Sequence, residues 1–452
     1  MPTNRRNFVI GAAASVAAAS TMPLAAQNSR RPNILFIMAD DVGYADLSVY
    51  GRRDYRTPVL DQLAADGLLM TQSYANAPSC SPTRVALITG RYHQRLPVGL
   101  PEPIRTRKLD PVGLPTGQAT LPGLLQATGY RTALVGKWHL GWPPEHGPLR
   151  HGYQYFFGTA SAAVEYFTHR ENDPAGQGDV GLFEGDKVVE REGYMTDLLA
   201  ERAVDEIRAA ARGAVPFLLS LHFNAAHWPW QGPKSAPLPA GSDLWHYDGG
   251  SLEIFAAMLK AMDAAIGRVL AELQRSGIAD NTIVVFTSDN GGERFSDTWP
   301  LRGGKRDLLE GGIRVPTLVR WPGSIAAGGR SDQVIASMDW LPTLLAAAET
   351  PTDPNSPFDG QNLLAVLRGQ APVRPRQLFW RFRNPDQAAA RDGDWKYLRI
   401  GADEYLFNIA ADPRERANRM TGEPERFARL KADWAVWNAQ MMPYQAAQPS
   451  RS

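Results

Sequence analysis

Early in its sequence the chain contains the mostly apolar run Asn33-Ile34-Leu35-Phe36-Ile37-Met38-Ala39, which ends at two acids, Asp40 and Asp41. A β-branched, apolar run without polar alternation is typical of a strand whose two faces are both buried. Such strands belong to parallel sheets that are covered by helices. The run therefore predicts a central strand of an α/β fold, with two carboxylates at its carboxyl end.

The same succession of apolar strands and helical segments continues along the chain. We expect further strands over residues 130–136, 216–223 and 282–288, and helices over residues 57–66, 120–128, 196–211 and 251–276. Helices that alternate with apolar strands indicate βαβ units. The predicted fold class is α/β, with a large, mostly parallel central sheet sandwiched by helices.

After about Leu367 the composition changes. Residues 369–376 are rich in Pro and Arg and are typical of a linker. Beyond them we expect short strands at 377–383, 395–400 and 405–408, turns at 392–393 and 401–402, and a helix over 425–440 that starts at Pro424. The run Asp412-Pro413-Arg414-Glu415 fits a turn. We predict a catalytic domain over residues 28–368 and a C-terminal subdomain over 369–452, a small antiparallel sheet with one helix.

The N-terminal segment has the pattern of a targeting signal. Arg5 and Arg6 precede Phe8 and an Ala-rich apolar stretch that ends near Ala25 and Ala26. A charged start, an apolar middle and small residues at the end are typical of a signal peptide, and paired arginines indicate twin-arginine export. We predict that residues 1–27 are removed and that the mature protein is periplasmic or secreted. A membrane anchor is the competing interpretation, and the stretch is short for one.

The composition limits the possible functions. The 452 residues carry 48 Lys and Arg against 47 Asp and Glu, a net charge of +1. Nucleic-acid-binding proteins are usually strongly basic, so no nucleic-acid partner is expected. The single cysteine, Cys80, excludes an internal disulfide and marks a reactive position in an exported chain. The oligomeric state stays open.

That cysteine opens the run Cys80-Ser81-Pro82-Thr83-Arg84, which precedes an apolar segment ending at Gly90. We expect a helix with Ser81 as its cap, Pro82 at its first position and Gly90 at its end. Cys80 would then lie at a helix N-terminus, which favours anions, and Arg84 would add a fork of donors suited to a tetrahedral oxyanion. A buried, inert cysteine is the alternative.

Acidic and amide side chains follow two of the expected strands. Asp40 and Asp41 follow the strand at 33–39, and Asp289 and Asn290 follow the strand at 282–288. Ligands of open α/β sheets collect beyond the carboxyl ends of strands. Carboxylate and amide oxygens are hard ligands that favour Ca²⁺ or Mg²⁺ over zinc. Ordinary turn residues are the alternative for each pair alone.

The pattern Cys-x-Pro-x-Arg, followed by Leu87-Ile88-Thr89-Gly90-Arg91, resembles the signature of the type I sulfatases, in the alkaline phosphatase superfamily. In that family the cysteine is converted to formylglycine, whose hydrated aldehyde is the nucleophile. The resemblance implies a formylglycine at Cys80, a formylglycine-generating enzyme as partner, and one Ca²⁺ that contacts residue 80. Its ligands would be Asp40, Asp41, Asp289 and Asn290.

Further segments match the same family. Gly136-Lys137-Trp138-His139-Leu140-Gly141 matches its second signature, and we expect Lys137 and His139 to point to one side of an extended segment. His227 lies in a His-x-Pro motif, and Lys305 lies in a Gly-rich loop. The resemblance implies that Lys137 and Lys305 contact the sulfate, that His139 partners the nucleophile, and that His227 or Lys305 protonates the leaving oxygen.

The resemblance implies a sulfuric ester hydrolase that releases sulfate from a sulfated carbohydrate or an aryl sulfate. Candidate substrate contacts are His93, Arg95, Trp228 and Arg302. Three alternatives stay open: a phosphonate or phosphate ester hydrolase of the same superfamily, a non-catalytic binder of sulfated glycans, and a thiol hydrolase that uses Cys80 and His139. A thiol hydrolase would leave the acidic pairs unexplained.

Overall fold

The computed structural model describes Met1 and residues 31–105, 112–171, 178–213, 215–239, 241–354 and 357–444. The predicted signal peptide lies outside the described residues apart from Met1, so its function stays a prediction. Residues from Arg31 onward form one compact unit. None of the helices within the described ranges is both long enough and apolar enough to cross a membrane.

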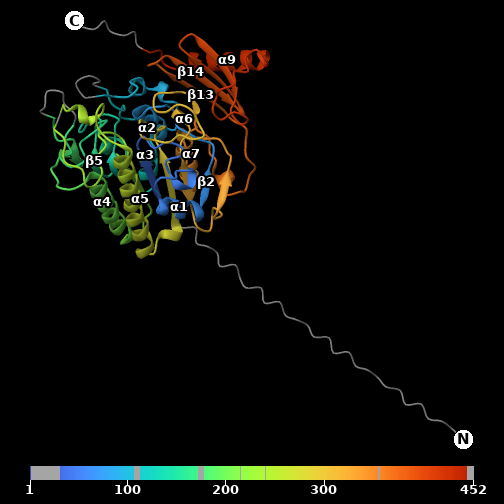
Figure 1. Ribbon diagram of the computed structural model, residues 1–452. Helices are drawn as coiled ribbons and strands as arrows, with labels where there is room; N and C mark the ends of the chain where they lie inside the picture. Colours follow the sequence, from blue (N-terminus) through green and yellow to red (C-terminus); the bar gives the residue numbers. More distant parts are fainter. Residues whose placement is uncertain are drawn as a thin grey trace. The chain divides into compact units, whose positions relative to one another are not determined.

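A ten-stranded sheet runs through the main part of this unit (Figure 1). Its order is β11-β2-β10-β9-β1-β8-β4-β5-β6-β7, and the five strands from β9 to β5 are mutually parallel. β10 and β6 pair antiparallel with the edges of this parallel core. The strands are β1 Asn33–Ala39, β2 Leu68–Met70, β4 Arg131–Lys137, β5 Tyr155–Thr159, β6 Leu182–Glu184, β7 Lys187–Val188, β8 Phe217–His222, β9 Thr282–Ser288, β10 Thr317–Arg320 and β11 Gly329–Ser331.

Strand β1 lies at the centre of the sheet and is buried on both faces. Leu35 and Ile37 pack into one core with α1, α4 and α5, whereas Phe36 and Met38 pack into another with α2, α3 and α7. The predicted sandwich of helices around a mostly parallel sheet is confirmed. The helices are α1 Pro58–Ala65, α2 Cys80–Thr89, α3 Leu121–Ala127, α4 Met195–Ala211, α5 Leu252–Arg275, α6 Glu310–Ile313, α7 Trp340–Ala347 and α8 Leu364–Leu367; β3 Ser73–Tyr74 and β12 Ile335–Ala336 form a small parallel pair.

The C-terminal sheet has four antiparallel strands and is covered by one helix. These elements are β13 Gln377–Phe382, β14 Gln387–Asp392, β15 Trp395–Ile400, β16 Asp403–Asn408 and α9 Pro424–Ala439. Sequence reasoning missed β14, because its three alanines have weak strand preference. In the structure Ala388 and Ala390 pack beside Leu430 of α9, while Ala389 packs in the core that also holds Tyr74.

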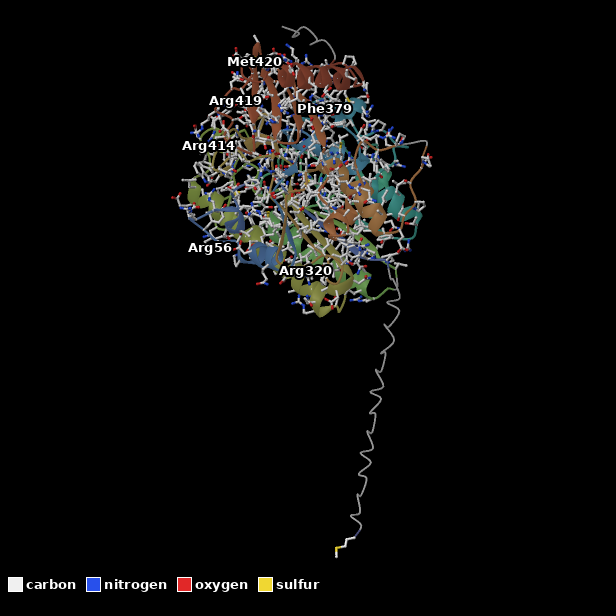
Figure 2. All side chains as sticks on the ribbon, turned by 90° about the vertical axis from the view of Figure 1, so that its right-hand side faces the viewer. Arg56, Arg320, Phe379, Arg414, Arg419 and Met420 are labelled. Carbon is white, nitrogen blue, oxygen red and sulfur yellow. The ribbon has the colours of Figure 1, made fainter. Side chains whose placement is uncertain are left out.

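The C-terminal sheet rests on the loops at the carboxyl end of the main sheet. Trp380 of β13 donates a hydrogen bond from Nε1 to the Ala75 carbonyl at 2.9 Å. Figure 2 labels Arg414, Arg419 and Met420 on the segment between β16 and α9. The Arg414 guanidinium lies 4.8 Å from the ring centroid of Trp299, so this segment reaches the loop that carries Lys305.

Candidate active site

The carboxyl ends of β1 and β9 bring the four predicted ligands together. Ala39 pairs with Ser288, so Asp40 and Asp41 emerge beside Asp289 and Asn290. The Asp41 amide donates to Asp289 Oδ1 at 3.3 Å, and Asn290 Nδ2 donates to Asp41 Oδ1 at 2.7 Å. All four side chains are buried. The juxtaposition expected from the parallel sheet is present, while the role of these residues as ligands stays a prediction.

Cys80 is the first residue of α2, which has Ser79 as its N-cap. The prediction that Ser81 caps this helix is wrong, since Ser81 Oγ accepts a hydrogen bond from the Ile104 amide at 2.9 Å instead. Pro82 is the third residue of the helix and not, as predicted, the first; it is tolerated there because first-turn amides have no intrahelical acceptor. Gly90 ends the helix in a left-handed conformation (φ 66°), as predicted. Cys80 Sγ lies 3.9 Å from Asp41 Oδ1, so the helix start points at the acids.

Three cations are fixed against the three carboxylates. Arg84 donates from Nε and Nη2 to Asp289 Oδ2, at 3.0 and 2.9 Å. Lys137 Nζ lies 2.5 Å from Asp40 Oδ2, and Lys305 Nζ lies 2.7 Å from Asp41 Oδ2. Each cation comes from a different element: α2, the end of β4 and the Gly-rich loop before α6. The site therefore holds a compact, nearly neutral set of charges.

The carboxyl pKa values show how these charges balance. Burial raises the pKa of Asp40, but the charges of Lys137 and Arg84 outweigh burial and bring it well below its usual range. Burial and the neighbouring carboxylates raise the pKa of Asp41 to about 7, despite Lys305. Burial and Asp40 raise the pKa of Asp289 to about 6. The carboxylates repel one another in a dry site, and an added cation would relieve that repulsion.

The two histidines predicted for the site have defined tautomers. His227 Nδ1 donates to the Trp228 carbonyl at 2.6 Å, which leaves Nε2 facing Asp41 Oδ2 at 3.7 Å. His139 Nε2 donates to the Ile104 carbonyl at 2.7 Å, which leaves its buried Nδ1 without a partner. Burial, reinforced by nearby lysines, lowers the pKa of both rings well below the usual value. Both rings are neutral acceptors in this state.

The backbone at His139 differs from the prediction. Lys137 ends β4, but His139 has a left-handed backbone with φ 58°, so residues 137–139 are not extended. The turn still leaves His139 close enough to Lys137, Arg84 and Asp40 for their charges to affect its pKa. The prediction that Lys137 and His139 lie close together is therefore right, although the extended backbone from which it was argued is wrong.

The residues present fit a hard divalent cation. Donor atoms of Asp40, Asp41, Cys80 and His227 all lie within 4.8 Å of one another. Asp40 Oδ1 and Asn290 Oδ1 are buried and have no hydrogen-bond partner, as expected of atoms that serve a cation. This set adds His227 to the predicted ligands, whereas Asp289 has both oxygens engaged, by Arg84 and the Asp41 amide.

The predicted substrate contacts lie in different surroundings. His93 is fully buried 3.7 Å from Glu102, and Arg95 forms two 2.7 Å hydrogen bonds to Asp359. Exposed Arg302 reaches the Glu415 carbonyl at 3.5 Å. Of the four, Trp228 alone packs against a predicted site residue: its half-buried ring lies 4.7 Å from the ring of His227. Substrate binding by His93, Arg95 and Arg302 stays a prediction, and the protein contacts of these side chains do not support it.

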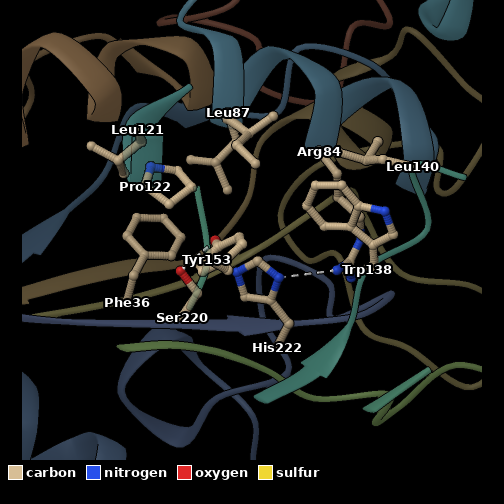
Figure 3. A pocket seen from close by; sticks show the side chains of 11 residues that line it. Phe36, Arg84, Leu87, Leu121, Pro122, Trp138, Leu140, Tyr153, Ser220 and His222 are labelled. Atoms are coloured by element: carbon tan, nitrogen blue, oxygen red, sulfur yellow. Dashed lines mark hydrogen bonds between the residues drawn. The ribbon is translucent and has the colours of Figure 1, made fainter. Parts of the chain in front are cut away.

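Behind Arg84 lies a cavity of about 20 Å³, room for a single water molecule (Figure 3). Arg84 and His222 both line it: His222 Nδ1 lies 3.4 Å from Arg84 Nη1, while its unpartnered Nε2 points toward Tyr153 and Ser220. Burial lowers the pKa of His222 to about 3, so the ring is neutral. His222, within β8, therefore supports Arg84 from behind.

Comparison with known proteins identifies the family. The family model described as Sulfatase matches residues 32–350. The chain belongs to the sulfatase family. A second model, described as N-sulphoglucosamine sulphohydrolase, C-terminal, matches residues 303–431 of this sulfatase. The family resemblance predicted from Cys80 and its neighbours is confirmed, and the enzyme is a sulfuric ester hydrolase.

Three relatives illustrate the similarity of this sulfatase to known ones. It is 35% identical to the N-acetylgalactosamine-6-sulfatase of Homo sapiens, over 81% of this chain and 71% of that protein. It is 33% identical to arylsulfatase J of Mus musculus, over 81% of this chain but only 60% of the relative. The crystal structure of Ps i-CgsB in complex with k-i-k-neocarrahexaose superposes with a TM-score of 0.82, at 28% identity, over 93% of this chain and 96% of that one.

Sequence reasoning missed two residues at the site. Glu293 Oε2 lies 3.6 Å from Lys305 Nζ, and Glu293 Oε1 lies 2.6 Å from His246 Nε2. Glu293 follows Asp289 by four residues, a spacing that could have pointed to it. His246 lies in a loop far from any other site residue in sequence, so no local pattern signals it.

Proposed function

We propose that this sulfatase releases sulfate from a carbohydrate or aryl sulfate ester, with a formylglycine derived from Cys80 as the nucleophile. The observation that carries the proposal is the position of Cys80 at the start of α2. The chain's single cysteine lies there, buried and 3.9 Å from Asp41, among three acids and three fixed cations. A nucleophile placed there lies beside three cations whose donors can bind the oxygens of a sulfate group.

Calcium is the cation that this ligand set would hold, through Asp40, Asp41, Asp289 and Asn290, with His227 at its edge. When bound, it would act as a Lewis acid toward a sulfate oxygen and the nucleophile. Lys137 and Lys305 bind the remaining sulfate oxygens, and Arg84 adds a third fixed positive charge. The backbone amides at the start of α2 favour the same anion.

The histidines divide the proton transfers. His139 Nδ1 is buried and unpartnered. It therefore accepts the proton of the second hydroxyl of the hydrated formylglycine when sulfate is expelled and the formylglycine aldehyde is restored. His227 is neutral and carries its fixed proton on Nδ1, so Nε2 takes up the proton of the attacking hydroxyl and delivers it to the leaving oxygen. Lys305 is the other candidate acid, although Asp41 and Glu293 hold it charged and so favour a binding role.

The test uses protein produced together with a formylglycine-generating enzyme. An aldehyde-reactive probe should label the peptide that bears residue 80 in the wild type but not in Cys80→Ala. Hydrolysis of 4-nitrophenyl sulfate should appear only in labelled protein. Faster hydrolysis of 4-nitrophenyl phosphate or a phosphonate ester would favour the related hydrolase instead. Tight binding of a sulfated glycan by unlabelled wild type, without turnover, would favour the non-catalytic binder.

We further propose that the enzyme is exported in folded form by the twin-arginine route, which allows modification and metal loading before export. The paired Arg5 and Arg6 support this proposal. Replacing both with Lys should keep an otherwise intact enzyme in the cytoplasm. Unchanged export of that variant would exclude the route.

A further inference from the structure

A row of aromatic rings leads from the catalytic His227 to the surface. The ring centroids of His227 and Trp228 are 4.7 Å apart, and the His246 ring follows 5.0 Å beyond Trp228. Tyr247 ends the row 5.0 Å beyond His246 and is 74% exposed. His227 itself is buried, so the row runs outward from the reacting centre to solvent.

Glu293 contacts both this row of rings, at His246, and the catalytic Lys305. Its Oε2 lies 3.6 Å from Lys305 Nζ, which also pairs with Asp41, while its Oε1 lies 2.6 Å from His246 Nε2. An ionised carboxylate only accepts hydrogen bonds, so His246 Nε2 donates, and in the neutral ring His246 Nδ1 is left as an acceptor. The His246 and Glu293 side chains are 28% and 26% exposed, so a ligand can reach them.

The wall formed by Trp228, His246 and Glu293 is held in place from behind. The buried Trp230 ring stacks on His246 at 5.8 Å, with the two planes 25° apart. Arg294 lies 5.1 Å from the Trp230 centroid and donates from Nη1 to the Tyr247 carbonyl at 2.7 Å. A binding wall whose side chains are already ordered loses little entropy when a ligand binds.

The chemistry of the wall selects its ligand. An aromatic face packs against the apolar face of a ring, while His246 Nδ1 is the acceptor of the wall that still needs a hydrogen-bond donor. A sugar ring offers both, through its C–H face and its hydroxyls. An aryl or steryl group offers only the apolar face. Binding one of these groups would leave His246 Nδ1 unpaired, at a cost.

We propose that Trp228, His246 and Glu293 form the subsite for the leaving part of the substrate, and that this part is a sugar ring with a free hydroxyl near the sulfate ester. The inference rests on the proposed sulfatase reaction. It adds a preference for sulfated saccharides over aryl sulfates, and it assigns that preference to residues outside the nucleophile and its cations.

The experiment compares kcat/KM for a panel of sulfated monosaccharides with kcat/KM for 4-nitrophenyl sulfate, in the wild type and in His246→Phe. The phenyl ring keeps the stacking with Trp228 and Trp230 but removes both nitrogens. We expect the saccharide-to-aryl ratio of kcat/KM to fall about tenfold, the effect of losing roughly one hydrogen bond. Leu244→Ala, an exposed change in the same loop, is the matched control and should keep the wild-type ratio.

Each outcome bears on one of the two proposals. An unchanged ratio in His246→Phe, or a wild type that hydrolyses the aryl sulfate but no sugar of the panel, overturns the subsite and leaves the proposed reaction standing. A wild type that hydrolyses neither substrate overturns the proposed reaction. If His246→Phe does not fold, the saccharide-to-aryl ratio of kcat/KM is measured in Glu293→Gln instead. This change removes the charge that orients His246, so the ratio should fall there too.

Discussion

Arg84 donates two hydrogen bonds to a single oxygen of Asp289, from Nε at 3.0 Å and from Nη2 at 2.9 Å, and both side chains are buried. A third bond runs from Nη1 to the Lys137 carbonyl at 2.9 Å. One planar group therefore links α2, β4 and the end of β9. A lysine carries the same charge but cannot form this fork.

We predict that Arg84→Lys lowers kcat for 4-nitrophenyl sulfate on the order of 100-fold, because the remaining charge is misplaced relative to the developing anion. Steady-state kinetics measures the loss. Arg131→Lys is the matched control: its ion pair with Glu206 at 2.7 Å is 38% exposed on the arginine side and distant from the acids in sequence and topology. A kcat for Arg84→Lys within threefold of the wild type would contradict the prediction.

Calcium should bind and stabilise this sulfatase. Asp40 Oδ1 and Asn290 Oδ1 lack partners, and the site holds three carboxylates. At a calcium concentration 100 times the Kd, the free energy of unfolding should rise by about 2.7 kcal/mol, seen as a higher Tm. Asn290→Ala should weaken calorimetric binding, whereas Asn281→Ala, at the opposite end of β9, should not. Equal binding by both variants would remove Asn290 from the ligand set.

A buried charge cluster joins the C-terminal sheet to α6. Lys396 Nζ of β15 lies 3.0 Å from Glu310 Oε1 and 2.9 Å from Glu415 Oε1, and all three side chains are buried. The Glu310 amide also donates to Glu415 Oε2 at 2.6 Å. The turn predicted at Asp412-Pro413-Arg414-Glu415 thus supplies a charge that meets the segment following Lys305.

Lys396→Met should therefore lower the free energy of unfolding by about 3–5 kcal/mol, because two buried carboxylates lose their shared cation. Urea denaturation measures the change. Lys431→Met serves as the control, since its pair with Glu404 is 51% exposed on the lysine side and should contribute less than about 1 kcal/mol. A similar small loss for Lys396→Met would show that the buried cluster is replaceable.

The stability of the protein should fall in mild acid, in part because of His151. Burial, with a smaller effect from His146, lowers the pKa of His151 to about 4 from an ordinary value of 6.5. Between pH 4 and 6.5 the unfolded chain binds a proton that the folded one does not, so stability decreases as pH falls through this range. The full contribution is roughly 3 kcal/mol.

His151→Phe should flatten that dependence. The phenyl ring keeps the stacking on Trp138, whose ring centroid lies 5.5 Å from that of His151, and neither His151 ring nitrogen has a hydrogen-bond partner to lose. Urea unfolding at pH 7 and pH 5 gives the comparison. Equal pH dependence in the wild type and the variant would show that other groups, such as His222, account for the whole effect.

His222→Phe should retain activity. Arg84 keeps its bonds to Asp289 and the Lys137 carbonyl, and the new ring keeps the edge contact with Phe36 at 6.4 Å. The variant also removes an unpartnered buried Nε2, which is costly to bury. We expect kcat within about threefold of the wild type and no loss of unfolding free energy above about 1 kcal/mol. A larger fall in kcat would make His222 a positioning residue for Arg84.

Local pattern was sufficient for the elements with a strong signal. The apolar runs at β1, β8 and β9 and the amphipathic segments at α4 and α5 each reveal their state through their own periodicity. Strand β14 was not predicted, because a run of alanines has no strong preference for a strand. Its position is fixed by β13 and β15, which pair with it on both sides.

The sequence alone determined the family, and it predicted Cys80 as the nucleophile with Arg84 beside it and acids at two strand ends, because these residues sit in short contiguous motifs with fixed spacing. Only the tertiary structure decided that Glu415 meets Glu310 across 105 positions, that His246 faces Glu293, and that each carboxylate has its own cation. The physical reason is that two charged groups interact strongly only when they are close together and buried. Both conditions arise when the sheet brings loops that are remote in sequence to one edge.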